Sequence, residues 1–151
     1  MPRRVFAATV EIDAPPELVW EVLTDLAAYP RWNPFTIEVR STLRVGDPID
    51  LTVRMSRLGW TVKQRERVSE VRAPERLAWT MKLGSRHLVN AERIQRIERL
   101  PSGGSRYTTE DAIAGALAPL VFAIFGTSLE DGFRAMAAAL KAEAEQRQRT
   151  M

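Results

Sequence analysis

The fold is decided by the stretch DAPPELVWEVLTDLAAYPRWNPF, residues 13–35, which lies between two regions of strand-like sequence. Its aliphatic residues recur at helical spacing and predict one short helix. They are Leu18, Val19, Val22, Leu23 and Leu26. Asp13 is the expected N-cap, because its carboxylate can accept hydrogen bonds from the first free backbone N–H groups. The helix should end near Ala28, since Pro30 disfavours helical geometry at the residue before it.

Strand-like sequence surrounds this helix on both sides. Residues 4–12 are rich in β-branched and aromatic side chains, which favours a first strand. Helical spacing is absent from 36 to 114. Six more strands are expected there, at 36–43, 48–57, 60–72, 76–83, 88–99 and 105–114. Short turns rich in glycine and proline separate them, which predicts consecutive antiparallel strands and not strand–helix–strand units.

Helical spacing returns near the carboxyl terminus. One apolar stripe consists of Leu129, Phe133, Met136 and Leu140. The sequence Thr127-Ser-Leu-Glu130 is typical of a capping box. We therefore expect a helix over 127–148, with a break or kink at Gly126.

This order of elements predicts an α+β, helix-grip arrangement. A curved seven-strand antiparallel sheet should wrap around the long C-terminal helix, with one or two short helices after the first strand. A straight helix cannot touch a curved sheet everywhere, so a cavity between them is expected. Such a cavity is the natural place for a ligand.

The composition excludes several kinds of chemistry. The chain of 151 residues has no cysteine and one histidine, His87, which excludes disulfides, thiol nucleophiles and multi-histidine metal sites. No metal or cofactor is therefore expected. The formal charge is +3, but acidic residues alternate with the arginines, so nucleic-acid binding is not expected. No apolar run reaches the roughly 20 residues of a membrane span, so we expect a cytoplasmic protein without integral membrane association.

Three segments resemble one known superfamily. Residues 13–35, the sequence Pro74-Glu-Arg-Leu-Ala-Trp79 and the run from Asp111 to Leu120 are similar to the START-related helix-grip (SRPBCC) superfamily. The similarity is to its polyketide cyclase/dehydrase-like branch, and it implies a single domain over residues 1–151. The superfamily includes cyclases and carriers of lipids and hormones, so the resemblance does not select one function.

The resemblance also implies a role for the turn after the first helix. The residues that match the family's Tyr-Pro-x-Trp-Asn-Pro segment are Tyr29, Pro30, Trp32, Asn33 and Pro34. In relatives this segment packs at one end of the cavity. One interpretation places Trp32 and Asn33 at the ligand entrance. The other makes them a structural plug, with the Asn33 side chain bonded to the backbone of the turn.

The alternation of side chains along each expected strand predicts the cavity wall. Apolar residues on inward faces should form one end, and polar residues on inward faces, Glu66 among them, should form the other. Alignment with the superfamily adds Arg93 and Gln95 to the polar end. The predicted ligand-binding residues are Trp32, Leu51, Val53, Met55, Trp79, Met81, Arg93, Gln95, Tyr107, Thr109 and Asp111.

Several classes of function remain open. The first is a binding module for a small hydrophobic molecule such as a lipid, an aromatic or a polyketide-like compound. The second is a cofactor-independent cyclase, dehydratase or isomerase that uses Asp111, Glu66 and Tyr107 as catalytic residues. A structural alternative makes the charged residues an ion-pair network that closes the barrel. A partner-binding module would be indicated by an exposed apolar patch. We favour binding of a small molecule, by a monomer or a homodimer.

Overall fold

The computed structural model describes residues 2–55, 59–85 and 87–151. One seven-stranded antiparallel sheet has the order β1-β7-β6-β5-β4-β3-β2. The strands are β1 (Arg3–Ile12), β2 (Thr36–Ser41), β3 (Pro48–Met55), β4 (Trp60–Arg72), β5 (Arg76–Leu83), β6 (Val89–Arg99) and β7 (Ser105–Ala114). The helices are α1 (Pro16–Thr24), the 3-10 helix η1 (Leu26–Ala28), α2 (Tyr29–Trp32) and α3 (Ala118–Thr150). The predicted α+β fold is confirmed; positions 56 and 57 of the predicted third strand lie outside the described residues.

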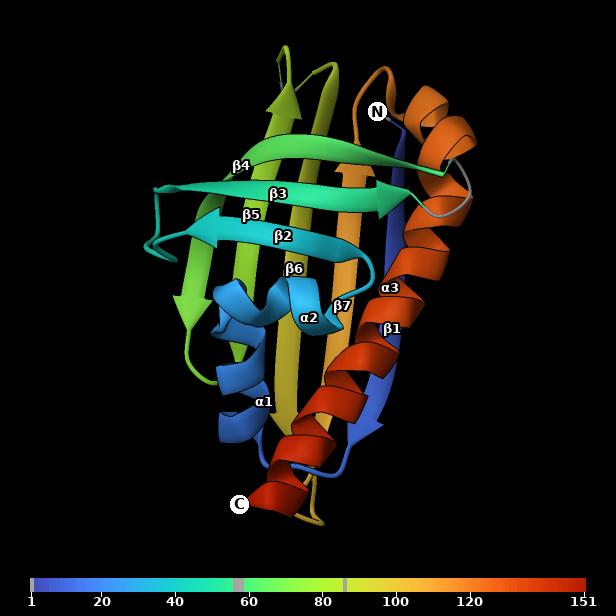
Figure 1. Cartoon of the computed structure of the whole chain (residues 1–151). Coiled ribbons are helices and arrows are strands. Elements are labelled where there is room, and N and C mark those ends of the chain that lie inside the picture. Colours follow the sequence, from blue (N-terminus) through green and yellow to red (C-terminus); the bar gives the residue numbers. More distant parts are fainter. Residues whose placement is uncertain (1, 56–58, 86) are drawn as a thin grey trace.

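The sheet is strongly curved, and α3 lies across its concave side. In Figure 1, β2, β3 and the first part of β4 run across the view, whereas β5, β6, β7 and β1 run along it. Strand β4 makes this change of direction, because it pairs with β3 up to Arg67 and with β5 from there on. The β4–β5 register shifts between Val68 and Glu70. Such a bulge bends a strand and increases its twist, which closes the sheet around the helix.

Helix α3 is continuous from Ala118 to Thr150, so the predicted break at Gly126 is wrong. A Cβ atom at Gly126 would lie 3.5 Å from the ring of Phe6 on β1, which is an ordinary contact distance. A glycine inside a helix costs about 1 kcal/mol relative to alanine, and packing on the sheet outweighs that local cost. None of the helices in the described part of the chain combines the length and hydropathy that a membrane span requires.

The start of α1 also differs from the prediction. Pro15 occupies the N-cap position, Pro16 follows it, and no side chain caps the helix. Proline suits this first turn because its missing N–H would have had no partner inside the helix. Asp13 lies before the helix, and its backbone N–H donates a hydrogen bond of 2.9 Å to the Glu145 carboxylate on α3. The predicted Asp13 cap is therefore wrong, and the contact instead joins the end of β1 to α3.

The core lies between α3 and the concave face of the sheet. Phe133, Met136 and Leu140 are buried there, which confirms the predicted apolar stripe. Gly132 lies beside them, at a point where a Cβ atom would be only 2.0 Å from the Phe35 ring. The absence of a side chain at Gly132 lets the turn before β2 approach α3 closely. Phe35 then packs edge-on against Phe133, with ring centroids 5.3 Å apart.

Candidate functional site

A cavity of about 420 Å³ lies between α3 and the concave face of the sheet. Its size is within the range of pockets that hold small organic ligands. The wall is mainly apolar, with Leu51, Val53, Met55, Val62, Trp79, Met81, Val89, Ala91 and Ile113 from the strands, and Phe35, Val121, Phe125, Leu129 and Phe133 from the opposite side. Three charged side chains that are buried or partly buried, Glu66, Arg93 and Asp111, also line it.

The register of β5, β6 and β7 orders this wall into successive rows from the strand ends inward. The rows are Leu83–Val89, Met81–Ala91–Ile113, Trp79–Arg93–Asp111 and Leu77–Gln95–Thr109. Leu83 in the first row is 61% exposed, so the cavity opens at that end. The last row is fully buried and does not line the cavity. The cavity therefore runs from an apolar mouth to a polar floor formed by the row of Arg93 and Asp111.

Arg93 is a buried cation that forms no ion pair with a carboxylate among the described residues. Its Nε donates to the Thr109 hydroxyl at 2.7 Å, and Nη2 lies 3.3 Å from the Met136 sulfur. The guanidinium carbon is 4.4 Å from the centre of the Phe133 ring, a cation–π contact. Within the described residues no carboxylate oxygen lies within the 4.0 Å of an ion pair with Arg93. The ion pair between Arg93 and Asp111 that the structural alternative would require is therefore not formed, although the two residues are neighbours across β6 and β7.

Two carboxyl groups at the cavity floor have pKa values raised by different amounts. Burial, together with repulsion from Asp111, raises the pKa of Glu66 to about 8, and the positive charge of Arg93 opposes this. Burial raises the pKa of Asp111 to about 6, again opposed by Arg93. At pH 7 Glu66 is thus mostly protonated and Asp111 mostly ionised. Asp111 Oδ1 is buried and accepts no hydrogen bond from any described residue.

The predicted polar residues Gln95, Tyr107 and Thr109 lie behind this floor. All three are fully buried, and the Tyr107 hydroxyl donates a hydrogen bond to Gln95 Oε1. Burial raises the pKa of Tyr107, so it remains protonated. Thr109 contacts the site through Arg93, whose guanidinium it helps to orient. None of the three lines the cavity.

The turn that contains Trp32 also lies outside the cavity lining. Trp32 packs edge-on against Tyr29, with ring centroids 5.1 Å apart. Asn33 Oδ1 accepts hydrogen bonds from the backbone N–H groups of Phe35 and Thr36, at 3.0 and 2.9 Å. This is the chemistry of the structural-plug interpretation. Burial of the Tyr29 hydroxyl raises its pKa, and the hydroxyl donates to the Leu23 carbonyl.

The structure therefore brings most of the predicted site residues together. Those that line the cavity are Leu51, Val53, Met55, Glu66, Trp79, Met81, Arg93 and Asp111. Ligand binding by these residues stays a prediction. The predicted ligand-binding residues did not include the wall that α3 contributes, in which Val121, Phe125, Leu129 and Phe133 recur every four residues. That spacing is visible in the sequence, but the expected break at Gly126 divided it.

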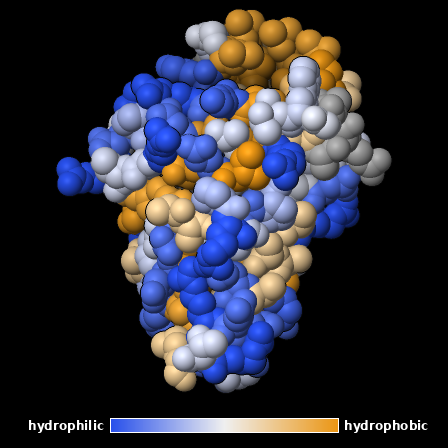
Figure 2. Space-filling model, viewed as in Figure 1, coloured by the Kyte–Doolittle hydropathy of each residue, from blue (hydrophilic) through white to orange (hydrophobic). Residues whose placement is uncertain are grey.

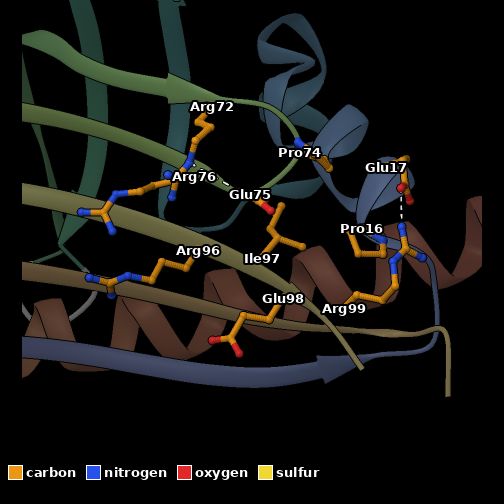
Figure 3. A pocket seen from close by; sticks show the side chains of 10 residues that line it. All are labelled: Pro16, Glu17, Arg72, Pro74, Glu75, Arg76, Arg96, Ile97, Glu98 and Arg99. Atoms are coloured by element: carbon orange, nitrogen blue, oxygen red, sulfur yellow. Dashed lines mark hydrogen bonds and ion pairs between the residues drawn. The ribbon is translucent and has the colours of Figure 1, made fainter. Parts of the chain in front are cut away.

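A second groove, of about 540 Å³, lies where α1 begins and the β4–β5 turn meets β6. Figure 3 shows Arg99 joined to Glu17 at one end, with Arg76 and Arg96 extending toward the other. Arg76 pairs with Glu70, Arg96 with Glu110, and Arg72 with Glu75. Since its arginines pair locally, this groove offers a ligand no unpaired positive charge among the described residues. Nor do the described residues contain a cluster of three or more histidine, aspartate and glutamate side chains that could hold a metal ion.

The fold is shared with several solved structures. The chain is similar to the ZhuI aromatase/cyclase of Streptomyces sp. R1128, with 21% identity, a TM-score of 0.78, and 97% of this chain and 96% of that chain covered. A START superfamily protein of Mycobacterium smegmatis has 22% identity and a TM-score of 0.70, covering 95% and 98%. A protein of Thermus thermophilus has 15% identity and a TM-score of 0.73, covering 95% and 99%.

Sequence comparison identifies the family more directly than these distant structural relatives do. No curated protein sequence matches the chain. Residues 3–145, by contrast, match the model of a family described as polyketide cyclase/dehydrase and lipid transport. That match covers nearly the whole chain. The chain belongs to this polyketide cyclase/dehydrase and lipid-transport family.

Proposed function

We propose that the protein binds a small, mainly apolar molecule whose oxygen-bearing end faces Arg93, Glu66 and Asp111. The observation that carries this proposal is the unsatisfied polar floor of an otherwise apolar cavity. Arg93 has no carboxylate partner among the described residues, and Asp111 Oδ1 accepts no hydrogen bond from them. Buried polar groups without partners are costly, by about 1–3 kcal/mol each. A ligand oxygen at this position would remove part of that cost.

The protonation states of the floor indicate which ligand groups fit. A carbonyl oxygen can accept hydrogen bonds from the Arg93 guanidinium and from Glu66, which is mostly protonated at pH 7. A hydroxyl group can donate to the ionised Asp111. The apolar wall toward the mouth, including Leu51, Met81 and Phe125, fits the hydrocarbon body of such a molecule. Ketones, phenols and alcohols with an aromatic or aliphatic body are therefore the expected class.

A displacement assay tests this proposal with two ligands of matched shape. The neutral dye Nile red reports occupancy of the cavity, and 2-acetylnaphthalene and 2-isopropylnaphthalene compete for it. The ketone should bind about 5- to 150-fold more tightly, the range that about 1–3 kcal/mol corresponds to. Arg93→Met and Glu66→Gln should reduce this preference for the ketone. Ala91→Phe, which fills the cavity, should instead lower the affinity of both ligands equally. Equal affinity of the two ligands for the wild type, or an unchanged preference in both polar variants, would contradict the proposal.

Catalysis is the second candidate function, and the two unequal carboxyl pKa values favour it. Two carboxyl groups held in different protonation states at one pH can act as a general acid and a general base. Asp111 would take a proton from the carbon next to a ligand carbonyl, while Arg93 and Glu66 stabilise the enolate oxygen. The enol can then attack a second carbonyl of the same molecule, or Glu66 can protonate a departing hydroxyl to release water. Tyr107 has no part in this scheme, because its hydroxyl is bonded to Gln95 behind the floor.

Hydrogen–deuterium exchange separates catalysis from simple binding. In D2O, enolisation replaces the methyl hydrogens of 2-acetylnaphthalene by deuterium, which NMR detects. An enzyme should accelerate this exchange, and Asp111→Asn should abolish the acceleration while the ketone still binds. Exchange at the rate of buffer alone in the presence of wild-type protein would remove the catalytic candidate and leave the binding proposal intact.

A further inference from the structure

Exposed apolar side chains lie at the end of the molecule where the cavity opens. Six of them, which we call the apolar rim, lie at this end of the molecule: Trp60, Leu83, Leu88, Leu117, Leu120 and Ile124. Leu83, Leu120 and Trp60 are 61%, 57% and 55% exposed. Figure 2 shows a hydrophobic patch over the first turns of α3, at the top of the view. Large apolar surfaces on a protein commonly mark a site of association.

Backbone contacts hold the parts of this rim side by side. The N–H of Ala116 donates to the carbonyl of His87, and the N–H of Leu117 donates to the carbonyl of Leu88, both at 2.9 Å. These bonds join the start of α3 to the β5–β6 turn. On the other side, Trp60 is the register partner of Met55, which lines the cavity. The apolar rim thus combines residues from three elements near the opening of the cavity.

Positive charges lie just behind the rim without local partners. Arg54, Lys63 and Lys82 each lie within three residues of a strand end at the mouth, and all three are exposed. None of them forms an ion pair with another described residue, in contrast to the paired arginines of the second groove. On β6, Asn90 is the register partner of Lys82, and the acidic Glu92 lies two residues beyond Asn90. The rim therefore combines an apolar surface with uncompensated positive charge.

We propose that this end of the protein docks on a bilayer that contains anionic phospholipid, with the mouth of the cavity facing the acyl chains. Leucine and tryptophan side chains enter the boundary between headgroups and acyl chains, and lysine and arginine bind the phosphate-bearing surface. In this orientation an apolar molecule passes between bilayer and cavity without crossing water. Docking does not depend on what the cavity holds, so it can be tested without ligand.

The charge pattern favours a bilayer over a second copy of the chain. In a symmetric dimer through this face, the same cations of both copies would meet, and none of them has an ion-pair partner among the described residues of its own copy. An anionic lipid surface instead compensates each cation individually. The rim residues also come from a helix start, a hairpin and a strand end, which can enter a fluid surface to different depths.

Vesicle sedimentation tests the proposal directly. Wild-type protein should sediment with vesicles that mix phosphatidylcholine and phosphatidylglycerol, more strongly than with phosphatidylcholine alone, and high salt should weaken this binding. Lys63→Gln and Lys82→Gln should each lower the partition coefficient about fivefold, the change that about 1 kcal/mol per charge corresponds to. The double variant Leu120→Asp, Ile124→Asp should abolish binding. Val45→Asp and Arg44→Gln, at exposed positions in the β2–β3 turn, are the matched controls and should bind as the wild type does.

Tryptophan emission provides a second readout. Trp60 is more exposed than the other three tryptophans, so docking should shift the emission to shorter wavelength, and Trp60→Phe should remove most of that shift. The proposal is overturned if wild-type protein binds neither vesicle, or if the rim and lysine variants bind as the controls do. It is also overturned if the protein is a dimer that Leu120→Asp, Ile124→Asp dissociates while vesicles bind neither form, because a second copy would then be the occupant of this face.

Discussion

Replacement of Glu66 by glutamine should change how the stability of the protein depends on pH. In the folded chain the pKa of Glu66 is about 8, against an ordinary value of 4.5, because burial and Asp111 disfavour its charged form. Between these two values the folded chain holds a proton on Glu66 that the unfolded chain has released. The free energy of unfolding must therefore fall as pH rises through this window and level off above about pH 8. Glutamine keeps the shape and the hydrogen-bond donor of the protonated acid but cannot ionise.

The size of the effect follows from the two pKa values. Each pH unit between them corresponds to about 1.4 kcal/mol, so the full window corresponds to about 5 kcal/mol of stability. Measurements from pH 6.5 to 8 leave most of the titration of Asp111 outside the range, since its pKa is about 6. Over that range Glu66 should lower the stability of the wild type by about 2 kcal/mol. The Glu66→Gln variant should match the wild type below about pH 4.5, exceed it by about 3 kcal/mol at pH 6.5, and exceed it by about 2 kcal/mol more at pH 8.

Urea unfolding at several pH values measures this difference, with the slope of each transition checked for constancy. Glu92→Gln, which alters an exposed carboxyl on β6, is the matched control and should follow the wild-type curve. Parallel pH curves for Glu66→Gln and wild type would refute the reasoning. They would mean that Glu66 does not keep its proton in the folded chain. The assignment of Glu66 as the protonated acid of the cavity floor would then be wrong.

Two predictions concern α3. Met136→Asp should lower the free energy of unfolding by more than about 4 kcal/mol in urea titrations, because it buries a charge against the sheet; an unchanged midpoint would mean that this stripe does not face the core. Gly132→Ala should cost about 1–3 kcal/mol, since its Cβ would meet Phe35 at 2.0 Å. Gly126→Ala, whose Cβ would be 3.5 Å from Phe6, should instead stabilise by up to about 1 kcal/mol, and equal effects of the two alanines would contradict the packing described.

Strand alternation predicted the apolar wall of the cavity well. Leu51, Val53 and Met55 on β3, and Trp79 and Met81 on β5, occupy alternate positions in short strands bounded by turns, and all five line the cavity. The alternation of side chains depends only on the backbone of each strand. It therefore survives even where the ends of a predicted strand are a few residues off, as they are for β2.

Local signals were misleading where tertiary packing overrides them. Gly126 and the sequence from Thr127 to Glu130 have the composition of a helix start, but the face of α3 that packs on the sheet continues through them. Asp13 has the side chain of a cap, yet the two prolines after it shift the start of α1. At Gly126 the deciding contact is with Phe6, a residue distant in sequence that a local pattern does not contain, whereas at Asp13 the deciding residues are the adjacent prolines.

The chemistry of the cavity floor was only partly predictable from the sequence. The resemblance to the superfamily predicted that Arg93 faces inward on its strand. In the structure, the strand register places Trp79 and Asp111 beside it. The hydrogen bond to Thr109 and the contact with Phe133 depend on side-chain conformation and on the position of α3. For the same reason Tyr107 and Gln95, although inward on their strands, are covered by neighbouring side chains and do not line the cavity.

The most direct test of the proposed binding function is a crystal structure of the protein with 2-acetylnaphthalene bound. The account predicts that the ring system lies among Leu51, Met81 and Phe125, with the ketone oxygen within about 3.2 Å of a donor on Arg93 or Glu66. Electron density for the ketone only in the groove beside α1, or in the cavity with its oxygen turned toward the mouth, would contradict the account.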